Sequence, residues 1–194
     1  MEKILYNVSK SYLEMARAPL RANFKYNNSA TQKPSSDTFL ALVSMTYIYS
    51  HMAIQAFVSG QLHSLWEKQD SELKNKFHDC ESFEKLMKSK LKLLKVALRE
   101  LCCQLKIQPI DIKEPKLWQE FNKFLKKSRD FFVHPDPDRF NEFLVISMEQ
   151  KTWGFASDVA SRIIKYFFEN TAKEIPDWLE KNTDFIIPEV KILD

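Results

Sequence analysis

The chain has 194 residues, of which 44% are hydrophobic and 28% charged, a balance typical of one globular domain with accessory segments. It contains two glycines, which argues against the Gly-rich phosphate loops of P-loop enzymes, protein kinases and Rossmann domains. The formal net charge of +3 is too small to indicate nucleic-acid binding on its own.

The cysteines and the hydropathy pattern favour a soluble protein. There are three cysteines, and two of them are adjacent, which fits neither a disulfide framework nor a zinc site. No uninterrupted apolar run reaches the roughly 18 residues of a membrane span, and the first residues lack the apolar stretch of a signal peptide. We therefore expect a cytoplasmic protein with reduced cysteines and no membrane partner.

Residues 1–36 are expected to form a short helix followed by a polar loop. The helix is predicted near residues 2–17, because apolar residues recur there at helical spacing. These residues are Ile4, Val8, Tyr12 and Met15. From residue 23 to residue 36 the composition becomes polar, which indicates a loop.

A long helix is predicted from about residue 37 to residue 68. Its first two-thirds are apolar on nearly every side, which indicates burial by more than one neighbour. Two alternatives are open for the side that a single bundle leaves uncovered. Either this side forms the interface of a homodimer, or residues 1–36 and the C-terminal tail wrap around it.

A second long helix is predicted over residues 82–106. Its apolar stripe runs from Phe83 to Leu105 at spacings of three and four residues. The opposite side carries basic residues at the same spacing, namely Lys85, Lys88, Lys92, Lys95 and Arg99. Such a face is more often solvated surface, although the lack of interleaved acids raises the chance that it tracks a phosphate backbone.

Two more helices and an irregular tail complete the chain. One helix begins near Pro115, which suits a first turn, and ends before Pro135. Another is predicted over residues 152–171, whereas residues 140–148 are ambiguous between helix and strand. Residues 171–194 contain two prolines and are expected to be irregular. The sequence thus predicts an all-α bundle with two long helices, shorter helices and irregular terminal segments.

The stretch from Lys126 to Pro135 carries the most informative pattern. It contains Arg129, Asp130 and His134 in the order Arg-Asp-x-x-x-His, near the end of a helix that follows two long helices. In this motif and its helical context the chain resembles the HEPN superfamily. The motif of that family is an arginine, often followed by a polar residue, with a histidine a few residues later. The resemblance implies a HEPN-like helical domain over residues 37–170.

The resemblance also implies a function and partners. It points to a homodimeric endoribonuclease that cuts RNA without a metal or another cofactor, with Arg129, His134 and Asp130 as catalytic residues. Proteins of this family often act as toxins, in antiviral defence or in RNA processing, and a neutralising antitoxin is frequently their partner. Lys126 and Lys127 directly precede the motif, and we expect them to contact substrate phosphates.

The residue types suit this chemistry. RNA is cut when its 2′-hydroxyl attacks the adjacent phosphorus, which needs a base, an acid and a cation. A histidine titrates near pH ~6.5 and serves as base or acid, while an arginine presents a charged planar fork to phosphate oxygens. On a regular helix Arg129 and His134 would lie about 140° apart. Pro135 pushes His134 out of the helical conformation, so that its side chain can swing back towards Arg129.

A second interpretation assigns no chemistry to the motif. The side chains of Arg129, Asp130 and His134 would then form a structural hydrogen-bond network at a helix end. The domain would be a non-catalytic HEPN-like module that binds a protein or a nucleotide. The other histidines show no metal-ligand spacing and are expected to be ordinary side chains; they are His51, His63 and His78.

Overall fold

The computed structural model describes residues 7–18, 36–133 and 154–180, and all regular structure in these ranges is helical, which confirms the all-α prediction. An N-terminal helix occupies residues 7–18. His134 and the ambiguous segment 140–148 lie outside the described residues. The remaining helices are α2 (Ser36–Trp66), α3 (Glu72–Lys76), α4 (Phe83–Ser89), α5 (Leu94–Gln104), α6 (Ile110–Lys113), α7 (Pro115–Glu120), the π-helical η1 (Phe121–Lys126), α8 (Lys127–Val133), α10 (Phe155–Asn170) and α11 (Asp177–Glu180).

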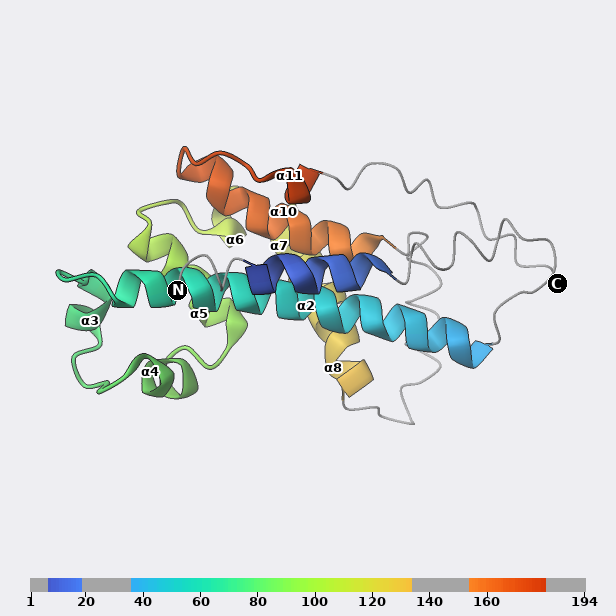
Figure 1. The fold of residues 1–194 in the computed structure, drawn as a ribbon, viewed down its shortest axis with the longest axis horizontal. Helices are drawn as coiled ribbons and strands as arrows, with labels where there is room; N and C mark the ends of the chain where they lie inside the picture. The colour runs from blue at the N-terminus through green and yellow to red at the C-terminus, as the bar shows by residue number, and fades with distance from the viewer. Residues whose placement is uncertain (1–6, 19–35, 134–153, 181–194) are drawn as a thin grey trace.

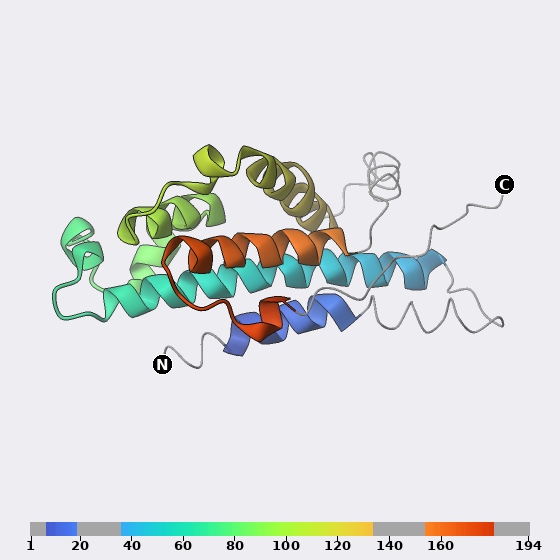
Figure 2. The ribbon, with the colours of Figure 1, turned by 90° about the horizontal axis from the view of Figure 1, so that it is seen from above.

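The long helices α2 and α10 lie side by side and form the centre of the bundle (Figures 1 and 2). The N-terminal helix and α11 cover one side of this pair, and the helices from α5 to α8 cover another (Figure 2). Aromatic rings fill the contact between α2 and α10, where the Phe57 ring lies 5.6 Å from that of Phe167 and 5.8 Å from that of Phe168. The apolar stretch that predicted α2 therefore forms the core of a single chain.

Helix α2 is covered from several directions within the chain, by α10, α8, α5 and the N-terminal helix. By length and composition alone, residues 41–66 of α2 would be long and apolar enough to cross a membrane. However, this helix carries three polar residues that are buried, Thr46, Ser50 and His51. Burial among other helices is the usual setting of a core helix in a soluble protein. The homodimer interface remains a prediction.

The N-terminal helix buries a different face from the one predicted. Ser9, Leu13, Ala16 and Arg17 are buried, whereas Val8 and Met15 of the predicted stripe are 36% and 42% exposed. The Ser9 hydroxyl donates a hydrogen bond to the backbone oxygen of Ala53 at 2.9 Å. The predicted helix is present and Tyr12 of the predicted stripe packs against the core, but Val8 and Met15 do not. Ser9 and Arg17 were missed because they are polar side chains that find partners in the core.

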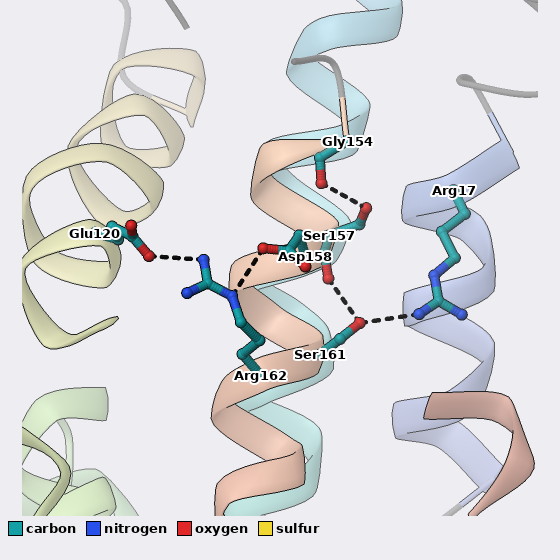
Figure 3. Close-up of polar contacts among 7 residues, drawn as sticks. All are labelled: Arg17, Glu120, Gly154, Ser157, Asp158, Ser161 and Arg162. Atoms are coloured by element: carbon teal, nitrogen blue, oxygen red, sulfur yellow. Dashed lines mark hydrogen bonds and ion pairs between the residues drawn. The ribbon is translucent and has the colours of Figure 1, made fainter. Parts of the chain in front are cut away.

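Arg17 ties three distant parts of the chain together, and Figure 3 shows its bond to Ser161 of α10. Its Nη1 donates to the backbone oxygen of Trp178 in α11, and its Nη2 donates to the Ser161 hydroxyl in α10, both at 2.9 Å. Helix α11 lies in the segment that was expected to be irregular, and its Trp178 and Leu179 are buried. Residues 177–180 are thus helical, and Trp178 and Leu179 belong to the core.

Residues 82–106 do not form one long helix, contrary to prediction. Helix α4 ends at Ser89, and α5 begins at Leu94. Between them the Leu91 amide bonds to the Leu86 oxygen at 3.0 Å, and Leu91 is 2% exposed. The break was missed because Leu91 is buried in the turn, so that the apolar spacing continues across it although the helix does not.

The basic face of this region is largely ion-paired. Lys85 pairs with Glu81 at 3.1 Å, and Lys88 pairs with Glu84 at 2.6 Å. Arg99 pairs with Asp111 of the following segment at 2.6 Å. Acidic residues outside the predicted basic stripe therefore pair with the basic residues. This pairing favours the interpretation of the basic face as solvated surface.

Candidate functional site

The motif is carried by a rod of three consecutive helices, α7, η1 and α8. Pro115 occupies the first turn of α7, as predicted. One face of the rod belongs to the core, where Leu117, Phe121, Leu125 and Ser128 are all buried. The middle of the rod is π-helical. This form is rare overall, but where it occurs it is often at a functional site.

Helix α8 is anchored on α2 directly beside the motif. The Tyr47 hydroxyl of α2 is hydrogen-bonded to the Ser128 hydroxyl, and burial raises the pKa of Tyr47, which keeps the phenol protonated. The Tyr47 ring also lies 5.9 Å from that of Phe132. These contacts on both sides of Arg129 fix the backbone that presents it.

Arg129 lies in the seam between α8 and α2. Its side chain is 26% exposed and bridges the two helices. Nη1 lies 2.9 Å from Oδ1 of the neighbouring Asp130. Nη2 lies 3.2 Å from Nε2 of His51, which is 78 residues away in the chain.

His51 is the acceptor in this contact. It is 5% exposed, and its ring stacks on that of Phe121 at a centroid distance of 6.4 Å. Burial lowers the pKa of His51 to about 4, assisted by the positive charges of Arg129 and Lys126 and opposed by Asp130. The imidazole is therefore neutral at pH 7, with its proton on Nδ1 and Nε2 free to accept from Arg129.

The guanidinium of Arg129 is not fully satisfied by the described residues. An arginine has about five N–H donors, and the contacts with Asp130 and His51 use one on each terminal nitrogen. Its Nε is buried and has no hydrogen-bond partner among the described residues. A buried donor without a partner costs about 1–3 kcal/mol. The arginine thus keeps unused donors at a partly open position.

The other predicted site residues on the rod differ in their exposure and in their contacts. The Asp130 side chain is 43% exposed and also pairs with Lys126, whose Nζ lies 3.4 Å from Oδ2. Lys127 is exposed. The structure therefore brings together Arg129, Asp130 and Lys126, a cluster with one net positive charge. His134 begins the segment that lies outside the described residues.

His51 is the site residue that the sequence analysis missed, because it was expected to be an ordinary side chain. Nothing in local spacing links it to Arg129. The available signal was its position within the apolar helix α2, four residues after Tyr47, where a polar ring needs a partner. Tyr47 and His51 both contact α8, so that this face of α2 packs against the helix that carries the motif.

The chain matches no family model, no curated protein and no solved structure. The likeness to the HEPN superfamily accordingly rests on the motif of Arg129, Asp130 and His134 and on the helical context that surrounds it.

Proposed function

We propose that this protein is a metal-independent endoribonuclease that cuts RNA by attack of the 2′-hydroxyl on the adjacent phosphorus. The observation that carries the proposal is the state of Arg129. It is partly exposed, held from two sides, and keeps unused N–H donors beside a cluster of net positive charge. A phosphate oxygen is the acceptor that such a guanidinium fits best. His134 follows five residues later in the chain.

In the proposed reaction the ribose 2′-oxygen forms a bond to phosphorus as the bond to the 5′-oxygen breaks. The products end in a 2′,3′-cyclic phosphate and a 5′-hydroxyl. His134 serves as base or acid, and a second copy of the chain supplies the other histidine in a homodimer. Arg129 stabilises the charge that develops on the phosphate oxygens. Asp130 orients Arg129, and Lys126 and Lys127 contact neighbouring phosphates.

The cellular role proposed here follows the family resemblance. The enzyme acts in the cytoplasm as a toxin or in antiviral defence, and a neutralising antitoxin protein restrains it. A toxic nuclease needs such restraint because its substrate is present throughout the cell.

The test is cleavage of bulk tRNA and of a generic mRNA in excess EDTA, with product ends analysed for cyclic phosphate. Wild type is compared with Arg129→Ala and His134→Ala. Arg162→Ala is the matched control, because Arg162 is a 40% exposed arginine held by Glu120 at 2.6 Å and Asp158 at 2.8 Å (Figure 3). We expect fragments from wild type and Arg162→Ala alone. Fragments that persist in both motif variants would overturn the proposal.

A second function has one observation in its favour. The bond between Arg129 and His51 joins α8 to α2, and a structural network would use the arginine in the same way. The domain would then be a non-catalytic module that binds a protein or a nucleotide. In that case Arg129→Ala destabilises the fold by about 3 kcal/mol or more, as expected when a buried network is broken, and no RNA is cut by the wild type.

A further inference from the structure

The two contacts of Arg129 differ in how firmly they are held. Asp130 lies on the same helix, is 43% exposed and is shared with Lys126. His51 lies on α2, is 5% exposed and is fixed by the Phe121 ring at 6.4 Å. A long side chain with only the exposed carboxylate as partner would sample several rotamers. The buried imidazole is the rigid member of the pair.

We propose that His51 is a positioning residue for Arg129, whose imidazole accepts a hydrogen bond from Nη2 and turns the guanidinium so that its remaining donors face the RNA phosphate. The inference rests on the ribonuclease activity proposed above. His51 itself does not touch the substrate in this arrangement, because its Nε2 is used by Arg129 and its ring is buried.

A neutral acceptor has an advantage over a carboxylate at this position. Lys126, Arg129 and Asp130 already contain one anion and two cations. A second carboxylate in place of His51 would bring the net charge of the cluster to zero and weaken its attraction for phosphate. The imidazole directs the guanidinium without neutralising it, since it stays uncharged at pH 7.

The charges around His51 come from one side. Among the described residues, the charged groups that act on it are Arg129 and Asp130 of α8 and Lys126 of η1. Its other named neighbours, the Phe121 ring of η1 and the Tyr47 phenol of α2, are uncharged. The described residues of α5, α10 and the N-terminal helix, which also pack on α2, add no charge to this site. A change at Arg129 should therefore be felt directly at the imidazole.

The first test is RNA cleavage by His51→Met, which keeps a similar volume without the acceptor, and by His51→Gln, whose amide oxygen can stand in for Nε2. We expect kcat to fall about 10- to 100-fold in His51→Met with a smaller change in KM, and His51→Gln to recover most of the loss. His63→Met is the matched control, because His63 lies on the same helix and its ring contacts Phe83 at 4.9 Å, not α8.

A combined variant separates positioning from a general effect on the fold. Since His51 acts through Arg129, adding His51→Met to Arg129→Ala should lower the cleavage rate no further. The inference is overturned if His51→Met cleaves as fast as wild type, or if its effect is undiminished in the Arg129→Ala background.

The second test does not depend on activity, so that a failure of the proposed function stays distinguishable. Nitrogen-15 NMR of the His51 ring should show a protonated Nδ1 and an unprotonated, accepting Nε2 between about pH 5 and pH 8. In Arg129→Met the titration of His51 should move to higher pH, because a neighbouring positive charge is lost. A proton on Nε2 in wild type, or an unchanged titration in Arg129→Met, would refute the inference whether or not RNA is cut.

Discussion

Two arginines of this protein bridge helices in opposite ways. Arg17 is 3% exposed and donates to a backbone oxygen and a serine hydroxyl, so that its donors are directed into the core. The Arg129 side chain is 26% exposed and has a carboxylate and an imidazole as partners. Both arginines join α2 or α10 to a neighbouring helix, but Arg17 is enclosed in the core whereas Arg129 is partly open to solvent.

The difference shows how a structural arginine and a site arginine can be told apart. A structural arginine donates its hydrogen bonds to neutral acceptors within the fold, and its removal lowers the free energy of unfolding. A site arginine is partly open to solvent, so that it can bind another molecule, and its removal is felt in function. Four predictions test this contrast.

The largest effect is expected for Arg129→Ala on RNA cleavage. Loss of the guanidinium should lower kcat about 100- to 1,000-fold, because a charge-stabilising donor is removed from the transition state. The free energy of unfolding, measured in urea, should change by less than about 1 kcal/mol, since an unsatisfied Nε is removed together with two hydrogen bonds. A large loss of stability would place Arg129 in the same class as Arg17.

Arg17→Ala should show the converse. Its two hydrogen bonds to Trp178 and Ser161 are lost, and the free energy of unfolding should fall by about 3–4 kcal/mol. Urea denaturation followed by circular dichroism measures this loss. Arg162→Ala serves as the control, and its partly exposed ion pairs should cost less than about 1 kcal/mol. Equal losses of unfolding free energy in the two variants would contradict a structural role for the two hydrogen bonds of Arg17.

The third prediction concerns pH and His51. The pKa of His51 is about 4 in the folded protein and about 6.5 in an unfolded chain, so that the unfolded chain takes up the proton first as the pH falls. The stability contributed by the neutral imidazole is complete above about pH 6.5 and decreases between about pH 6.5 and pH 4, by about 3 kcal/mol at pH 4. His51→Gln should lack this decrease, which urea titrations at several pH values will measure. Parallel curves for the two proteins would be inconsistent with a buried neutral His51.

The smallest effect is expected for Asp130→Asn. The carboxylate is 43% exposed and its pairs with Arg129 and Lys126 are screened by water, so that the free energy of unfolding should fall by less than about 1 kcal/mol. The difference should shrink further in about 1 M salt. Glu84→Gln, which removes a fully exposed pair with Lys88, is the control for unfolding at low and high salt. A larger, salt-independent loss would make Asp130 part of the core network.

Much of the fold could be predicted because single residues mark its boundaries. Pro115 fixes the start of α7, continuous apolar composition defines α2, and apolar residues at helical spacing define α10. The break between α4 and α5 could not be predicted, since Leu91 preserves the apolar spacing in a turn. The buried face of the N-terminal helix was missed because Arg17 and Ser9 are polar and become favourable only when their distant partners are present.

The same limit applied to the candidate site. Arg129 and Asp130 could be singled out because they are neighbours within one motif, and the structure brings them together at 2.9 Å. His51 lies 78 residues before Arg129, on another helix, and only tertiary packing of α8 on α2 relates them. A motif within one helix is visible in sequence, whereas the residue that orients it from a second helix is not.

The two long-range hydrogen bonds of Arg17 also have a consequence for synthesis of the chain. Its two bonds join positions separated by 144 and 161 residues, so that both partners leave the ribosome long after Arg17 does. Contacts of such separation carry the largest loop-closure cost and form late. Until then the Leu13 side of the nascent N-terminal helix has no finished surface to pack on. This helix contacts α2 through Ser9 and Tyr12, so that it can dock on α2 early, whereas the Arg17 bonds that complete the docking form only after α10 and α11 have been synthesised.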